Sequence, residues 1–129
     1  MSKIEILLID DSLAFNHLTR LTIKQAGIEC TVTEVHNGLR GIEYLKEAEI
    51  IPHIILLDIN MPVMDGFEFL EEYMAAGIDK NLSHIYMLTS SSQEADKQRA
   101  LSYHSVKGYF EKPLEKNDLL SIIAGIKNQ

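Results

Sequence analysis

The sequence has few residues that can cross-link a chain or restrict its backbone: its 129 residues include one cysteine and three prolines. It also has no tryptophan. A single cysteine excludes an internal disulfide, so we expect a reducing compartment. No apolar stretch approaches the roughly 20 residues that cross a bilayer, and acidic residues follow the short apolar run near the N-terminus. These shortages predict a soluble, cytoplasmic protein with no membrane partner. The initial Met favours a free protein over an excised piece.

Basic residues are also scarce, because 12 Lys and Arg stand against 19 Asp and Glu, a formal net charge of −7. Binding to nucleic acid relies on clustered basic side chains that meet the phosphate backbone. The charge therefore argues against nucleic acid as a direct partner. An acidic surface can instead attract divalent cations or steer a basic protein partner.

Short apolar runs alternate with longer segments whose apolar residues have helical spacing. Strands are predicted over residues 4–9, 30–35, 53–57, 84–88 and 108–110. Helices are predicted over about 13–26, 38–48, 67–77, 93–103 and 115–127. Five strand-then-helix units predict one α/β domain over residues 1–129, a doubly wound five-stranded parallel sheet with helices on both faces. The first and third strands are almost entirely apolar, as central strands are, whereas the second alternates like an edge strand.

Polar residues stand where several predicted strands end. Asp10 and Asp11 follow the first strand, Asp58 follows the third, Thr89 ends the fourth, and Lys112 follows the fifth. Singly, each has an ordinary interpretation: a helix cap, a turn or a solvated lysine. Ligands of open α/β sheets bind at the carboxyl ends of the strands, however. Together, three carboxylates can hold a hard cation, and a hydroxyl and an ammonium can meet an anion.

Four segments carry a family resemblance: IDDS, LLDINMPVMDGFEFL, MLTS and GYFEKPL, in that order along the chain. From about Ile4 to Ile126, the sequence resembles the receiver domain of two-component response regulators, of the CheY-like single-domain type. The resemblance implies a flavodoxin-like fold with the strand order 2-1-3-4-5 that is known for CheY itself. Many receivers have Gly-Ala where this chain has Ser105 and Val106, which leaves the geometry of the loop before the last strand open.

The resemblance also implies roles for the residues at the strand ends. Asp58 resembles the phosphoacceptor. Asp10, Asp11, Asp58 and the backbone carbonyl of Asn60 resemble the ligands of Mg²⁺ or Mn²⁺. Such an ion is needed because a carboxylate and a phosphoryl group are both negative and repel each other. A dication beside Asp10 and Asp11 would also explain why two like charges stand together.

Three further residues match the family's motifs. Thr89 and Lys112 resemble the groups that bind the phosphoryl oxygens, and Thr89 with Tyr109 resembles the switch pair. We expect the Lys112 side chain to be exposed enough that its loss costs little stability. The resemblance implies a cis peptide bond between Lys112 and Pro113, which the sequence alone would not indicate.

The function implied is a phosphorylation-activated signalling switch. A sensor histidine kinase or a histidine-phosphotransfer protein would phosphorylate Asp58, and the face formed by the fourth helix, fifth strand and fifth helix would then bind an unknown downstream protein. We expect no enzymatic activity beyond the domain's own phosphorylation and dephosphorylation.

Two alternatives are open. A Mg²⁺-dependent phosphatase with an aspartyl nucleophile needs a D-x-D motif, but Ile59 and Asn60 follow Asp58. A degenerate receiver could be a constitutive binding module, although the complete set of strand-end residues argues against it. The segment HNGLRG, from His36, faintly resembles a histidine-phosphotransfer motif, but it follows an edge strand and its Asn-Gly pair suits a turn.

Overall fold

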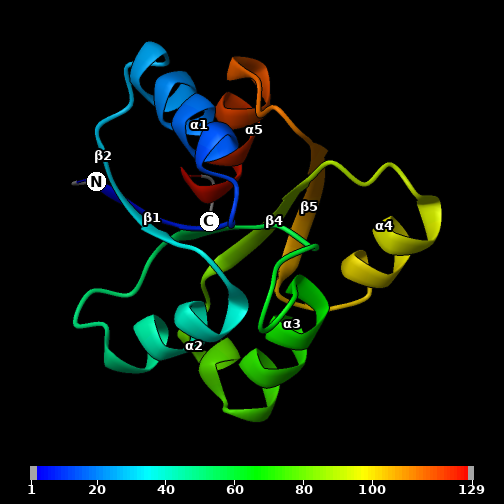
Figure 1. The fold of residues 1–129 in the computed structure, drawn as a ribbon. Helices are drawn as coiled ribbons and strands as arrows, with labels where there is room; N and C mark the ends of the chain where they lie inside the picture. The colour runs from blue at the N-terminus through cyan, green and yellow to red at the C-terminus, as the bar shows by residue number, and fades with distance from the viewer. Residues whose placement is uncertain (1–2, 128–129) are drawn as a thin grey trace.

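The computed structural model describes residues 3–127 (Figure 1). Strands and helices alternate along them: β1 (Ile4–Ile9), α1 (Leu13–Gln25), β2 (Cys30–Val35), α2 (Gly38–Glu47), β3 (Ile54–Leu57), α3 (Gly66–Ala75), β4 (His84–Thr89), α4 (Glu94–Leu101), β5 (Val106–Glu111) and α5 (Lys116–Lys127). A short 3₁₀ helix, η1 (Ile78–Asn81), was not predicted. The other elements lie within about two residues of their predicted bounds. Among the described residues, none of the helices is both long and apolar enough to span a membrane.

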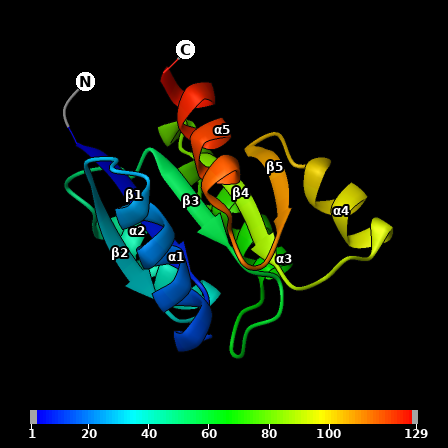
Figure 2. The ribbon, with the colours of Figure 1, turned by 90° about the horizontal axis from the view of Figure 1, so that it is seen from above.

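The five strands form one parallel sheet in the order β2-β1-β3-β4-β5. The predicted doubly wound fold and the strand order implied by the resemblance are therefore confirmed, with β2 at an edge. Helices α1 and α5 cover one face of the sheet, and α2 and α3 cover the other (Figures 1 and 2). Each helix between two strands returns the chain so that all five strands run in the same direction and end at the same edge of the sheet.

The core lies on both faces of the central strands. Leu7 and Ile9 of β1 pack toward α2 and α3, whereas Ile6 and Leu8 pack toward α5. All four residues of β3 are buried. Burying one such side chain contributes about 1.5–3 kcal/mol. Among the described residues, the buried acidic residues are Asp10 and Asp58, and both follow strands at their carboxyl ends.

The sequence also fixes how the chain leaves these ends. Ser12 caps α1 by accepting a hydrogen bond from the Phe15 amide. Asp65 caps α3 in a reciprocal capping box with Glu68. The next residue must be glycine, because a Cβ atom at Gly66 would collide with the carbonyl oxygen of Asp58. The Asp-Gly pair thus holds the loop after β3 against the strand end.

The departure from Gly-Ala before the last strand is accommodated inside the sheet. Val106 is buried, joins the core and pairs with Ile85, so β5 begins two residues earlier than predicted. The pairing shifts by one residue between Ile85 and Tyr86. This irregularity lies at the amino end of the strands, away from the predicted site.

Val63 lies in the loop between β3 and α3 with a φ of 70° and 73% of its surface exposed. A left-handed conformation costs a residue other than glycine about 1–2 kcal/mol, and a branched Cβ makes it worse. We predict that Val63→Asn raises the free energy of unfolding by about 1 kcal/mol, measured by urea denaturation, because asparagine tolerates this conformation. Val63→Thr keeps the branched Cβ and should change little. Equal stability of the two variants would contradict the strain at this position.

Candidate functional site

Three carboxylates meet at the carboxyl end of the sheet. Asp10 and Asp11 follow β1 and Asp58 follows β3, and the two strands are neighbours with Ile9 paired to Leu57. One oxygen from each carboxylate lies within 4.8 Å of the others. Asp10 and Asp58 are buried, whereas Asp11 is exposed. The structure thus brings together the three acids that the sequence analysis singled out.

Two of the acids are held by backbone amides. The Ser12 amide donates to Asp10 Oδ1 at 2.9 Å, and the Ile59 amide donates to Asp58 Oδ1 at 2.8 Å. Each carboxylate is thereby fixed through one oxygen. The other oxygen of each is left to face the neighbouring strand end.

Lys112 joins these two remaining oxygens. Its ammonium lies 2.7 Å from Asp10 Oδ2 and 3.0 Å from Asp58 Oδ2. The Phe15 ring of α1 lies over the ammonium, with its centroid 4.7 Å from Nζ. Only 4% of the Lys112 side chain is exposed, so the expectation of an exposed lysine is wrong. The side chain crosses the edge of the sheet beneath Phe15 instead of extending into solvent.

The backbone at Lys112 extends the edge of the sheet. Its amide donates to the Thr89 carbonyl at 2.9 Å, which continues the pairing of β4 with β5 past the strand end. The peptide bond to Pro113 is cis, as the resemblance implied.

Charge at the site does not balance. Burial raises the pKa of Asp10, and the hydrogen bonds from Lys112 and Ser12 only partly offset that rise. Burial would lower the pKa of Lys112, but its hydrogen bonds to Asp10 and Asp58 outweigh burial and raise it, so the ammonium stays charged. By formal charge, three carboxyl groups and one ammonium leave two negative charges at the site. A hard divalent cation with oxygen ligands matches that remainder.

Thr89 and Tyr109, the predicted switch pair, both contact Ser91. Thr89 ends β4 and is buried, and its hydroxyl accepts a hydrogen bond from the Ser91 amide at 3.3 Å. The Tyr109 hydroxyl donates to the Ser91 carbonyl at 2.8 Å. The Ser91 hydroxyl donates to Asp96 of α4 at 2.7 Å. Ser91 therefore links both members of the pair to α4.

A polar hollow of about 530 Å³ opens beside the site. Its lining residues are Asn60, Ser90, Ser91, Ser92, Gln93 and Asp96. The predicted ligand role of the Asn60 carbonyl stays a prediction, although the residue lies on this hollow. Sequence reasoning did not anticipate the contact of Phe15 with Lys112. An apolar residue in the first turn of a helix gave no sign that it would cover a lysine.

Comparison with known proteins gives consistent relatives. A family model described as the response regulator receiver domain matches residues 6–124. The chemotaxis protein CheY of Halobacterium salinarum is 30% identical over 123 residues, which cover 95% of both chains. The sensor histidine kinase CheAY of Helicobacter pylori is 36% identical over 118 residues, and this chain spans only 14% of its length.

Solved structures agree with these relatives. A two-component response regulator from Cytophaga hutchinsonii has a TM-score of 0.92, 30% sequence identity and full coverage of both chains. The Mn²⁺-bound form of the response regulator Rcp1 has a TM-score of 0.74 and 29% identity, with 96% of this chain and 91% of that chain covered.

We predict that Lys112→Met lowers the free energy of unfolding at pH 7 by about 3 kcal/mol, because it leaves two buried carboxylates without their cation. The pKa of Asp10 is raised in the folded protein, so folding favours the protonated carboxyl group. The stability that protonated Asp10 contributes is lost as the pH rises from 3.8 through the raised pKa. The deficit of the variant should accordingly shrink in acid, where a neutral Asp10 no longer repels Asp58. Urea denaturation at several pH values measures both effects.

Lys97→Met serves as the control, because Lys97 is exposed on α4 and the same change there should be nearly neutral. If the Lys112 variant were as stable as the Lys97 variant at pH 7, the ion pairs of Lys112 would not stabilise the fold.

Proposed function

This chain belongs to the response regulator receiver domain family of two-component systems, and on that basis we propose that it is a phosphorylation-activated signalling switch. We propose that residues 1–129 act as one receiver domain in the cytoplasm. Its phosphoryl donor would be a sensor histidine kinase or a histidine-phosphotransfer protein, and its output a downstream protein and not nucleic acid. The observation that carries the proposal is the environment of Asp58, a buried carboxylate with an amide on one oxygen and Lys112 on the other.

The donor set fits Mg²⁺ or Mn²⁺. Asp10, Asp11 and Asp58 offer oxygens within 4.8 Å of one another, and the Asn60 carbonyl would complete the set. Hard oxygen ligands and a surplus of two negative charges suit these ions. A bound ion would neutralise the incoming phosphoryl group and orient it toward Asp58. The Mn²⁺-bound form of Rcp1 supports this assignment by likeness.

Asp58 would act as the nucleophile. One of its oxygens forms a bond to phosphorus while the bond between phosphorus and the donor's imidazole nitrogen breaks. The electron pair of the broken bond stays on that nitrogen, which takes up a proton. The product is an acyl phosphate on Asp58 and a free histidine on the donor. Such transfers depend on positioning and charge stabilisation more than on covalent chemistry by the protein.

Lys112 and Thr89 would stabilise the transferred group. The Lys112 ammonium lies 3.0 Å from Asp58, so it is next to any phosphoryl group attached there, and it can exchange this carboxylate for a phosphoryl oxygen. The Thr89 hydroxyl would turn from the Ser91 amide and donate to another phosphoryl oxygen. Thr89 ends β4, the neighbour of β3, and Lys112 follows β5, which lies one strand further.

The phosphoryl group would change the partner-binding face through Ser91. When the Thr89 hydroxyl turns toward Asp58, the Ser91 amide loses its hydrogen-bond acceptor. Ser91 is also hydrogen-bonded to the Tyr109 hydroxyl and to Asp96. Movement of this loop would therefore reach β5 and α4 together. A local charge change that biases a two-state loop is a common design for such switches.

The phosphatase alternative gains no support from the site. The second acid of a D-x-D motif would fall at Asn60, which cannot protonate a leaving group. The only activity we propose is self-directed: the groups that stabilise transfer to Asp58 also stabilise attack of water on the acyl phosphate. Asn60 and Ser91 both line the adjoining hollow, from which water could approach.

We predict that acetyl phosphate labels this protein with one phosphoryl group, on Asp58, only when a divalent cation is present. No partner is needed, because the chain itself supplies Asp58, Lys112, Thr89 and the carboxylates. Intact-mass spectrometry measures the added mass, and its decay over minutes measures hydrolysis.

Asp58→Asn is the control, because it keeps the side-chain shape and removes the nucleophile. Labelling of that variant to the same extent, or labelling of the natural protein in excess chelator, would refute the proposed role of Asp58.

A further inference from the structure

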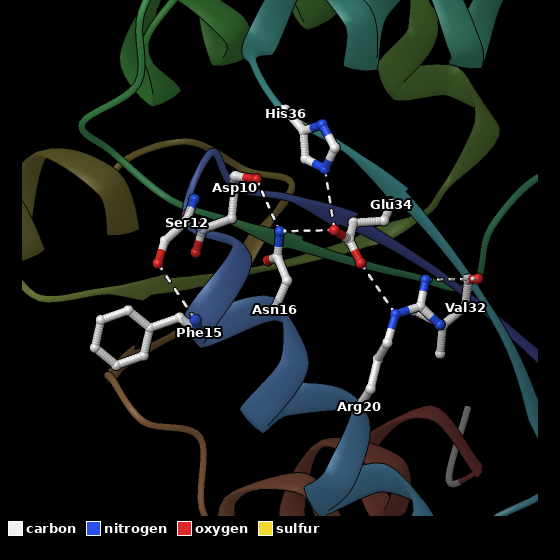
Figure 3. A network of polar contacts seen from close by, with 8 residues as sticks. All are labelled: Asp10, Ser12, Phe15, Asn16, Arg20, Val32, Glu34 and His36. Carbon is white, nitrogen blue, oxygen red and sulfur yellow. Dashed lines mark hydrogen bonds and ion pairs between the residues drawn. The ribbon is translucent and has the colours of Figure 1, made fainter.

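A buried polar network supports the loop that carries Asp10 and Asp11 (Figure 3). Asn16, in α1, has only 1% of its surface exposed. Its amide nitrogen donates one hydrogen bond to the backbone carbonyl of Asp10, at 3.0 Å, and a second to Glu34 Oε2, at 3.1 Å. An amide has two N–H donors, so both are used.

The other atom of the Asn16 amide has no such partner. Among the described residues, Asn16 Oδ1 is one of two buried side-chain nitrogen or oxygen atoms that have no hydrogen-bond partner. Leaving a buried acceptor unpaired costs about 1–3 kcal/mol. An apolar side chain would avoid that cost, so stability alone does not account for asparagine here. Asparagine supplies this position with two N–H donors, one for the Asp10 carbonyl and one for Glu34.

The hydrogen bond from Asn16 to the Asp10 carbonyl fixes the direction in which the Asp11 side chain points. Within residues 3–127, no side chain or amide bonds to the Asp11 carboxylate, so only its backbone aims it. The peptide group between Asp10 and Asp11 sets that aim. Its carbonyl is the one that Asn16 holds, and the Asp10 amide on the other side is held by the Val35 carbonyl at 3.1 Å.

The second N–H of Asn16 donates to the carboxylate of Glu34, near the end of β2, which other side chains also hold. Glu34 Oε1 accepts from Arg20 Nε at 3.0 Å, and Oε2 also pairs with His36 Nε2 at 3.0 Å. Burial raises the pKa of Glu34, but the hydrogen bonds from His36, Arg20 and Asn16 outweigh it and lower the pKa. Glu34 is therefore ionised at neutral pH and acts as an acceptor for all three groups.

We propose that Asn16 and Glu34 are positioning residues for the metal-binding carboxylates, which they fix without touching the ion. Asn16 fixes the Asp10–Asp11 peptide, and Glu34 fixes Asn16 against the end of β2. This inference deepens the proposed function and rests on it. Outer groups that orient metal ligands typically contribute tenfold to a hundredfold to metal affinity.

Two nearly isosteric substitutions test the network. Asn16→Asp places a carboxylate against the Asp10 carbonyl and against Glu34, so both contacts become repulsive. Glu34→Gln keeps one acceptor for Asn16 but loses the charge that binds Arg20. We expect Asn16→Asp to weaken Mg²⁺ binding about tenfold, and Glu34→Gln to weaken it by a smaller factor. Mg²⁺ titration followed by amide NMR shifts measures each dissociation constant on folded protein.

A second measurement separates positioning from general destabilisation. In protein without added metal, the Asp10 amide, which donates to the Val35 carbonyl, should exchange its hydrogen faster in both variants, while amides in the centre of β3 exchange as in the natural protein. The rate of labelling by acetyl phosphate should fall at low Mg²⁺ and recover at saturating Mg²⁺. A merely structural role would instead lower the unfolding midpoint and leave Mg²⁺ affinity unchanged.

Glu43→Gln is the matched control. Glu43 pairs with Arg40 on the exposed surface of α2, so the substitution removes the same charge from another glutamate–arginine pair. Its Mg²⁺ affinity should equal that of the natural protein. An equal loss in Glu43→Gln and Glu34→Gln would mean that net charge alone is responsible and would overturn the role of Glu34.

The remaining outcomes distinguish this inference from the proposed function. If both network variants bind Mg²⁺ with natural affinity while the natural protein is labelled on Asp58, the inference is wrong and the function stands. If the natural protein neither binds Mg²⁺ nor accepts the label, both are wrong. Should Asn16→Asp fail to fold, Glu34→Gln decides, because its side chain is partly exposed and its loss leaves the core intact.

Discussion

A buried ammonium shared by two carboxylates holds the site together. Lys112 lies 2.7 Å from Asp10 and 3.0 Å from Asp58, and it binds the last strand end to the first and third. A fixed positive charge of this kind can take the place of solvent around a phosphoryl group and stabilise its transfer. One ammonium cannot neutralise three acids, however, so the same arrangement that stabilises the fold also attracts a dication. Stability and the proposed chemistry therefore depend on the same three side chains.

The sheet makes this meeting possible. Residues about 50 and 100 positions apart in the sequence become neighbours because five parallel strands end at one edge, where the buried carboxylates Asp10 and Asp58 lie. Around it, each loop is held by a different device. Gly66 permits close approach to Asp58, Ser91 connects Thr89 with Tyr109, and Asn16 links the first strand end to Glu34. Rigid strands and supported loops can thus transmit a local change of charge to a partner surface.

Much of this arrangement could be predicted, and the reason is topological. Periodicity located the strands and helices, and a parallel sheet must place Asp10, Asp58 and Thr89 at one edge. The strand order itself came from the resemblance and not from periodicity. Contacts made by helix faces were not predictable: nothing in the sequence indicated that Phe15 would cover Lys112, or that Asn16 would reach two acceptors. Lys112 was wrongly expected to be exposed, because a lysine before proline is ordinarily solvated. Its burial depends on the packing of α1, whose Phe15 covers the ammonium.

The central claim is that Asp58 carries the phosphoryl group while Lys112 and Thr89 stabilise it. The most direct measurement is a crystal structure with Mg²⁺ and beryllofluoride, a mimic of the phosphoryl group. Beryllium should be bonded to an Asp58 oxygen, the Lys112 ammonium should contact a fluorine atom, and the Thr89 hydroxyl should have turned from the Ser91 amide toward another fluorine. Beryllofluoride bound elsewhere, or bound at Asp58 with Lys112 and Thr89 in their present contacts, would contradict the account.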